Sequence, residues 1–447
     1  MNIKVILFRT GLPIILSILA TKSSVAQENA SQEWDLNQCL NYALEHNIQV
    51  NKKKLAVLSS EADYLKSKSQ RLPNLSASIS ESFTNSKTQS AVTSGSWDLN
   101  SGTSASISSS LLIYNGGIIS NTIKQSQINV DIANLDVEIT KNNIILSITQ
   151  AYLNVLYAKE SVDYNKEILS TSLKQVERAR ELIKAGSIAR ADLAQLEAQY
   201  ASDQYSLVTA QNTLISNTTN LKQLLEIPVI DTFKVMFPEI NFNKEFSSLP
   251  TINEAFNTSL SVMPDIKLSQ LDQTVAEINV KIAKAGYMPT LSMNANYSTD
   301  FSNQKTNSFG TQLSDNQMQR IGLSLSIPIF NKYATSTSVQ KSKITLKQAD
   351  LSMQETKKNL LQNVENVYQN TIAGKSRYDA AIVQYSSADE SYKISETQFN
   401  LGMINAVDLL KVKNTLLNAN KELIQAKYSA ILNRKILDFY LGKSISL

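Results

Sequence analysis

The chain repeats itself at one fixed offset. The offset is the separation between Pro73 and Pro289, which lie in matching Leu-Pro-Asn-Leu and Met-Pro-Thr-Leu runs. Other anchor residues keep the same spacing: Asn115 and Asn331, Tyr152 and Tyr368, Gly186 and Gly402, and Asp192 and Asp408. A repeat that runs without a shift across nearly the whole chain means two copies of one structural unit. We therefore expect the same order of elements to occur twice.

Residues 1–26 have the pattern of a secretory signal. Lys4 and Arg9 give a basic start, residues 12–20 are an apolar run, and Ser24-Val25-Ala26 is a small-residue cleavage site. The apolar run is shorter than the roughly 20 residues that a membrane-spanning helix needs. We expect the mature chain to be exported and, if it enters a membrane, to do so through strands.

The composition argues against chemistry that needs metal-ligating or nucleophilic side chains. Cys39 is the only cysteine and His46 the only histidine, so the chain has too few of these residues for a typical zinc site or for histidine-based catalysis. A net charge of +4 without a basic, aromatic-rich stripe argues against nucleic acid as a partner. The sequence predicts no enzyme, no metal and no cofactor. Its 12 glycines and 8 prolines are few for 447 residues, which favours long uninterrupted helices.

Each copy predicts the same order of segments. Repeat 1 covers residues 27–226, with short helices at 34–47 and 48–71, strands at about 73–83 and 103–114, a long helix at 118–184 and a return helix at 190–226. A linker at 227–250 leads to repeat 2 at 251–442, with strands at about 289–301 and 319–330, a long helix at 334–400 and a return helix at 407–440, before a tail at 443–447. The polar segments 84–102 and 302–318 are predicted to be exposed loops.

The helical segments carry a sustained heptad pattern. The first return helix places apolar residues at Leu193, Leu196, Tyr200, Leu207, Ala210 and Leu214. Such a repeat makes helices supercoil about one another in a left-handed sense. At about 1.5 Å per residue, a helix over 118–184 is roughly 100 Å long. It would run beside two shorter helices stacked end to end.

The strand segments alternate apolar and polar residues, as in Leu75, Ala77 and Ile79 against intervening serines. Four strands cannot close a barrel, because single-chain barrels need about eight. An open sheet in lipid would leave unpaired backbone groups at both edges. Three chains would supply a closed barrel of 12 strands. A soluble sheet with one wet face could show the same alternation, and we rank it second.

The paired motifs resemble those of the outer membrane efflux protein family, the TolC-like channels. The resemblance spans residues 34–442 and includes both strand entries, the strand-to-helix elements at 112–117 and 327–331, and the turns at 185–193 and 401–410. It implies an α+β membrane protein with four long-helix segments and four barrel strands per chain. Three chains would form a barrel in the outer membrane lipid and a helical tunnel in the periplasm. It further implies a passive exit channel that works with a periplasmic adaptor and an inner-membrane pump in efflux or type I secretion.

The resemblance also assigns roles at the two turns. Family members narrow the tunnel with acidic residues just after the turns, and Asp192 and Asp408 match such positions. Each could instead simply favour a helix start, a reading that is strong for Asp192. Where the best-known members carry a second aspartate, this chain has Lys411, an i, i+3 neighbour able to pair with Asp408. We expect weaker cation selectivity than a doubly acidic tip would show.

Family members hold the tip closed with a tyrosine and an arginine, but the matching residues here are Phe399 and Ile404. Neither can make those hydrogen bonds, so apolar packing is expected to replace them. The resemblance assigns adaptor contact to the turn residues Gly186, Ser187, Gly402 and Met403, although both glycines could serve only to end helices. A structural periplasmic coiled coil or an adaptor subunit is the alternative function. The sequence does not name the cargo.

Overall fold

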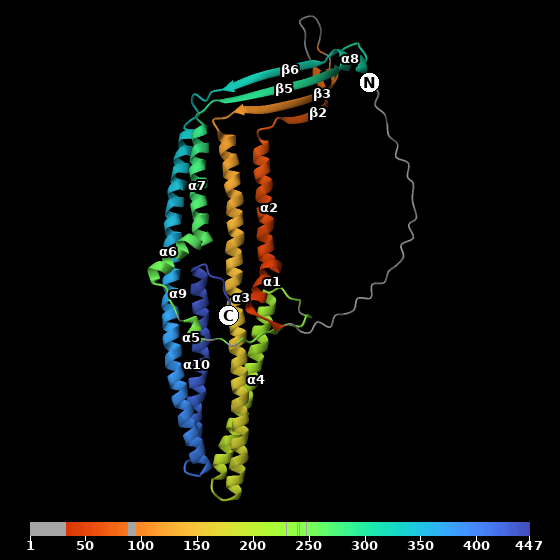
Figure 1. Cartoon of the computed structure of the whole chain (residues 1–447). Coiled ribbons are helices and arrows are strands. Elements are labelled where there is room, and N and C mark those ends of the chain that lie inside the picture. Colours follow the sequence, from red (N-terminus) through yellow and green to blue (C-terminus); the bar gives the residue numbers. More distant parts are fainter. Residues whose placement is uncertain are drawn as a thin grey trace, which may run out of the picture.

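The computed structural model of the protein describes residues 33–87, 95, 97–228, 230–238, 240, 242–246 and 248–447. The predicted signal at 1–26 lies outside these residues. A four-stranded sheet lies at one end of a long bundle of helices, and two helix-to-helix turns form the opposite end (Figure 1). We call the end with the turns the tip.

Two helices of 67 residues run the length of the bundle, α3 (Ile118–Lys184) and α9 (Ala334–Asn400), over the residues predicted for them. Two 22-residue helices, α2 (Ile48–Ser69) and α7 (Pro264–Ala285), flank them on the sheet side. Two 35-residue helices, α4 (Arg190–Leu224) and α10 (Ala406–Tyr440), flank them on the tip side (Figure 1). None of the described helices has an apolar stretch long enough to cross a membrane.

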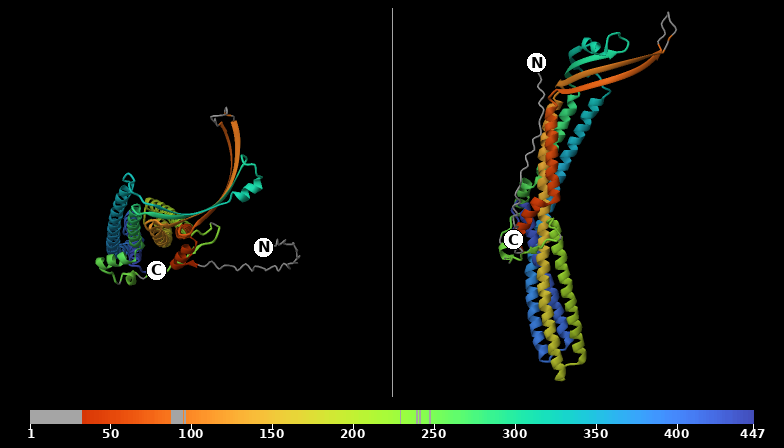
Figure 2. Two further views of the ribbon diagram at one scale, coloured as in Figure 1. Left: turned by 90° about the horizontal axis from the view of Figure 1, so that it is seen from above. Right: turned by 90° about the vertical axis from the view of Figure 1, so that its right-hand side faces the viewer.

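The sheet is antiparallel with strand order β2-β3-β5-β6, so β2 and β6 are its edges. It comprises β2 (Asn74–Lys87), β3 (Trp97–Tyr114), β5 (Thr290–Ser302) and β6 (Met318–Ser326). Seen along the bundle, it curves away from the helices (Figure 2). The strands of the two repeats meet where β3 pairs with β5. Each repeat therefore contributes one hairpin to a single sheet.

Three strand boundaries differ from those predicted. β2 and β3 extend into the predicted loop at 84–102, because pairing continues through polar residues as far as Lys87 and Trp97. β6 stops at Ser326 rather than near residue 330, and Pro328, which has no N–H for a ladder, lies just beyond it. The predicted loop at 302–318 contains a short helix, α8 (Phe309–Asp315), whose first turn is capped by Ser308.

Serine pairs connect β2 to β3 across one face of the sheet. The side-chain hydroxyls of Ser76 and Ser108, and those of Ser78 and Ser106, are 2.9 Å apart. Ser80 and Ser104 repeat the contact at 2.7 Å. Period-two alternation therefore places a row of mutually hydrogen-bonded hydroxyls on one face and Leu75 and Ile79 on the other.

Short elements lie along one side of the bundle at its middle, and we call them the belt (Figure 2). It contains α1 (Leu36–His46), α5 (Phe242–Glu245), α6 (Ile252–Val262) and the parallel pair β1 (Glu33–Trp34) and β4 (Lys234–Val235). Tyr152 of α3 is fully buried there, and its hydroxyl donates a 2.6 Å hydrogen bond to the carbonyl of Met236. Burial raises the pKa of the neighbouring Cys39 thiol to about 12. The belt thus packs short segments from both repeats against the long helices.

Candidate functional site at the helical tip

The two tip turns have the same backbone geometry. Gly186 and Gly402 adopt φ angles of +72° and +75°, which side-chain-bearing residues rarely adopt. The N–H of Ser187 donates to the carbonyl of Leu182 at 2.8 Å, and the N–H of Met403 makes the corresponding bond in the second repeat at 2.9 Å. These bonds end α3 and α9 and satisfy carbonyl groups of their last turns. No heavy atom lies within 4 Å of a Cβ added at either glycine, so both turns are open on their outer side.

Asp192 joins the two turns. One carboxylate oxygen accepts a 3.2 Å hydrogen bond from the N–H of Ala189 in its own turn. The other accepts a 3.2 Å hydrogen bond from the N–H of Ala406, the first residue of α10. The half-buried side chain therefore caps two helix starts, where negative charge is favoured.

Asp408 and Lys411 lie on the exposed surface of the first turns of α10. The backbone N–H of Asp408 donates to the side chain of Asn405, which caps the helix. Among the ion pairs of the described residues, none joins Asp408 to Lys411, in contrast to the pairing that their spacing allows. Both charged side chains can therefore interact with ions or with other molecules at the tip.

An apolar cluster holds the tip together. Phe399 is 1% exposed and packs with Leu182, Leu196 and Leu409, while Ile404 is half-buried at the edge of the cluster. All four tip helices contribute residues to this cluster. Phe399 and Ile404 therefore contribute apolar packing to the tip, as the sequence predicted.

Polar residues further from the turns also connect the two helix hairpins, and motif comparison does not reveal them. Gln175 of α3 donates to the hydroxyl of Tyr392 on α9 and, at 3.4 Å, to Glu396. Arg178 of α3 donates to the carbonyl of Asn400 at 3.3 Å. Burial, followed by the Glu396 charge, raises the pKa of the Tyr392 phenol.

A buried ion pair lies deeper in the same interface. The ammonium of Lys413 on α10 is 2.7 Å from a carboxylate oxygen of Asp203 on α4, with side-chain exposures of 0% and 5%. Ser172 of α3 contacts both groups through its hydroxyl, and Gln199 donates to the second Asp203 oxygen at 2.8 Å. Burial lowers the pKa of Lys413, and Asp203 opposes that shift. One sequence feature could have indicated this pair. Asp203 is a carboxylate at a heptad position between Tyr200 and Leu207, where an apolar residue is expected.

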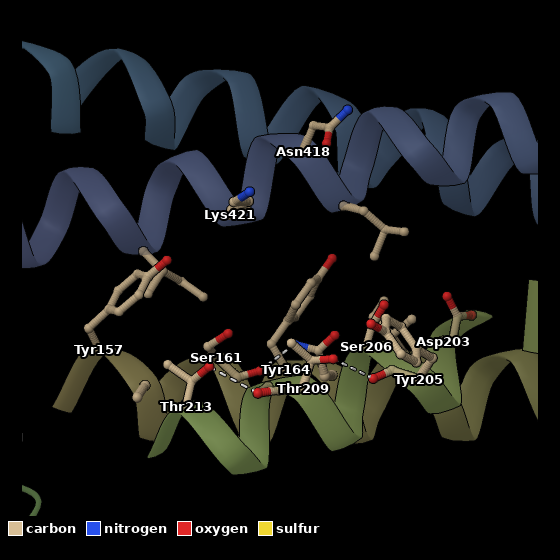
Figure 3. Close-up of a pocket in the computed structure, with 16 residues that line it drawn as sticks. Tyr157, Ser161, Tyr164, Asp203, Tyr205, Ser206, Thr209, Thr213, Asn418 and Lys421 are labelled. Carbon is tan, nitrogen blue, oxygen red and sulfur yellow. Dashed lines mark hydrogen bonds between the residues drawn. The ribbon is translucent and has the colours of Figure 1, made fainter. Parts of the chain in front are cut away.

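A groove of about 480 Å³ begins at Asp203 and extends along the interface between the helices. It is lined by residues of α3, α4 and α10, including Tyr164, Asp203, Thr209, Asn418 and Lys421 (Figure 3). The hydroxyl of Tyr164 is buried, and no partner among the described residues bonds to it. Within the part of the chain described above, no cluster of side chains is suited to a metal ion.

Two long helical hairpins, with a four-stranded antiparallel sheet at the end opposite the tip, define an elongated and mostly helical class of protein. The sequence profile described as "Outer membrane efflux protein" matches residues 39–225 and 256–443, which is most of the chain. The chain belongs to this outer membrane efflux protein family.

Known proteins of this kind resemble the chain in sequence and in fold. Outer membrane protein TolC of Escherichia coli (strain K12) is 26% identical over 308 residues, which are 68% of this chain and 62% of TolC. The alignment with TolC of Vibrio cholerae is 23% identical and covers 66% of each chain. The chain thus matches less than two thirds of these relatives' length.

Solved structures extend the similarity in fold to nearly the whole chain. CusC superposes with a TM-score of 0.78 at 17% identity, covering 92% of this chain and 93% of CusC. VceC from Vibrio cholerae has a TM-score of 0.75 at 16% identity, covering 92% and 96%. At these identities the likeness establishes the fold.

Proposed function

We propose that three copies of this chain form a passive exit channel of an efflux or type I secretion system. Membership of the outer membrane efflux protein family makes the chain an outer membrane protein. In the proposed assembly, three four-stranded sheets close a 12-stranded barrel in the lipid, and the helices form a tunnel that reaches into the periplasm. Relatives include a toxin and drug export protein and a proteases secretion protein, which supports an export role.

The single observation that carries this proposal is the open sheet. Among the described residues, β2 and β6 each pair with one strand, so each leaves a row of backbone groups unpaired by these strands. Such edges cannot face hydrocarbon, and closure of a ring removes them. The face that would meet lipid carries Leu75, Ile79, Ile321 and Leu323, all at least 69% exposed in the single chain.

Unpartnered apolar stripes on the helices support the same ring. On α2, Leu55, Leu58 and Leu65 are exposed at heptad spacing. On α9, exposed apolar residues recur at a constant interval close to a whole number of helical turns, which keeps them on one face: Leu361, Ile372, Val383 and Ile394. The two helices flank the bundle on opposite sides (Figure 1). A neighbouring copy on each side would cover both stripes.

At the tip, we propose that Asp192, Asp408 and Lys411 lie around the pore constriction. Three copies would place three exposed Asp408 carboxylates and three Lys411 ammonium groups around one axis, where charge sets ion selectivity. We further propose that the open turns at Gly186, Ser187, Gly402 and Met403 contact a periplasmic adaptor, which an inner-membrane pump supplies with cargo.

The assembly is tested by extracting the full-length protein from outer membranes with detergent and measuring its mass and its conductance in planar lipid bilayers. We expect a trimer that inserts and carries current. A water-soluble monomer that carries no current would contradict the channel and favour a periplasmic structural role.

The constriction is tested by Lys411→Asp. We expect this substitution to increase cation selectivity, because it adds negative charge to a narrow ring. Reversal potentials measured across a salt gradient report the change. Lys66→Asp, on α2 near the sheet, makes the same charge change far from the tip and should leave the potentials almost unaltered. An unchanged reversal potential for Lys411→Asp would show that this residue does not line the constriction.

A further inference from the structure

We propose that Lys413, Asp203 and Ser172 form a latch that positions the two helical hairpins in the closed state of the tip. The proposal rests on the proposed channel function. Lys413 would act as a positioning residue: it touches no cargo but determines where α10 lies against α3 and α4. Asp203 and Ser172 would be its receiving site.

The latch connects parts of the chain that are otherwise separate hairpins. α3 and α4 form one antiparallel hairpin through the turn at Gly186, and α9 and α10 form the other through Gly402. The Lys413 ammonium crosses from the second hairpin to Asp203 at 2.7 Å and to the Ser172 hydroxyl. The hydroxyl of Ser172 also bonds to Asp203, so the receiving site is a connected polar group within the first hairpin.

The internal repeat does not keep these polar residues at the corresponding positions of its two copies. The positions in the second repeat that correspond to Ser172 and Asp203 are Ala388 and Ala419, which are buried in the apolar cluster of the tip. The position in the first repeat that corresponds to Lys413 is Glu197, whose exposed side chain pairs with an exposed arginine. The second repeat therefore has two buried alanines where the first has Ser172 and Asp203. The buried charges serve the contact between the hairpins.

Physical chemistry makes a buried ion pair suited to a contact that must open. Desolvation offsets much of the attraction between buried charges, so the pair adds directional specificity more than net stability. When the hairpins separate, both groups regain hydration, whereas an apolar contact would expose hydrocarbon to water. A groove begins at Asp203, so the pair lies beside open space rather than inside continuous packing. The ion pair can therefore fix one arrangement of the closed hairpins and still keep the free energy of separating them small.

Removal of one member of the pair should weaken the closed state. Lys413→Met keeps a long side chain but leaves the Asp203 carboxylate buried without its cation, a state that water entry and separation of the hairpins would relieve. We expect the resting conductance of purified trimers in planar bilayers to rise several-fold in Lys413→Met. Asp203→Asn should act in the same direction with a smaller rise, because its amide oxygen still accepts a hydrogen bond from Lys413.

Removal of both charges should reverse the effect. In the double variant Lys413→Met/Asp203→Leu no buried charge remains at the latch, and apolar side chains fill the space there. We expect its resting conductance to be at or below that of the unsubstituted protein. A double variant as leaky as Lys413→Met would overturn the latch, because the leak would then come from altered shape rather than from charge pairing.

A second buried lysine of α10 supplies a matched control. Lys435 pairs with Glu245 at 2.5 Å in the belt, far from the tip, and its side chain is also buried. Lys435→Met should lower the melting temperature but leave the resting conductance unchanged. Equal leaks in Lys413→Met and Lys435→Met would attribute the effect to general destabilisation and overturn the proposal.

The channel and the latch can fail separately. Trimers that conduct, with equal resting current in the unsubstituted protein and Lys413→Met, would overturn the latch and leave the channel standing. Failure of the unsubstituted protein to form trimers that carry current would overturn the channel and the latch together.

Discussion

Individual acid–base groups in the interface between hairpins respond to pH in opposite directions. Glu160 of α3 accepts hydrogen bonds from Lys427, at 2.8 and 3.0 Å, and from the Tyr428 hydroxyl, at 2.6 Å. Burial, followed by Glu160, raises the pKa of Tyr428, so its contribution to stability is present below the ordinary tyrosine pKa and is lost above it. Burial lowers the pKa of Lys413, so its contribution instead becomes more favourable as pH rises towards the ordinary lysine value.

Tyr428→Phe tests the tyrosine contribution. The unsubstituted protein should lose thermal stability as pH rises from about 9 to about 11, because the buried phenol resists ionisation while the unfolded chain does not. The variant should show a shallower loss, measured as the melting temperature of the helices by far-UV circular dichroism. Tyr205→Phe, at a 75% exposed position, should keep the original pH dependence. Equal slopes in Tyr428→Phe and the unsubstituted protein would exclude Tyr428 as a source of the loss.

At the scale of elements, strong local patterns were predictable and contacts between elements were not. Heptad spacing and scarce glycine indicated α3 and α9 with the bounds that the structure has. The helix α8 was missed because a short polar segment carries no readable period. The partner of Asp203 was missed because a heptad pattern reports that a residue faces a neighbouring helix but not which helix supplies Lys413.

Phe399 tests whether apolar packing maintains the end of α9. Phe399→Ala should destabilise the tip locally by about 3 kcal/mol, because a large side chain in a closed cluster leaves a cavity. Hydrogen exchange should accelerate at amides near the Gly402 turn and remain unchanged in the belt. Met403→Ala, at a 69% exposed position in the same turn, is the matched control and should alter exchange little. Similar exchange in both variants would show that the cluster does not hold the tip.

For the whole molecule, a single chain packs its two helical hairpins against each other but leaves apolar residues exposed on α2 and α9. The sequence predicted four strands, and general rules about membrane strands predicted that four are too few. The exposed stripes on α2 and α9 could be identified only once folding showed which helix faces remain uncovered. Residues such as Leu55 and Val383 look like ordinary core positions in the sequence, because their period is the same whether the partner is internal or a second copy.

Leu55→Asp/Leu65→Asp tests the α2 stripe. We expect the trimer to dissociate in mild detergent, because a subunit interface would otherwise bury two carboxylates without partners. Size-exclusion chromatography with light scattering measures the fraction of monomer. Ala56→Asp, at an exposed position on another face of the same helix, should leave the assembly intact. A stable trimer in the double variant would place the subunit contact elsewhere.

The serine rows on β2 and β3 bear on how molecules would travel past the sheet. Because Ser76, Ser78 and Ser80 bond to serines on the opposite strand, their hydroxyls already have partners before any solute arrives. Each pair shares one hydrogen bond and keeps one hydroxyl proton and free lone pairs, which water can occupy. These uncharged hydroxyls would hydrate the path of a solute without themselves favouring either sign of charge.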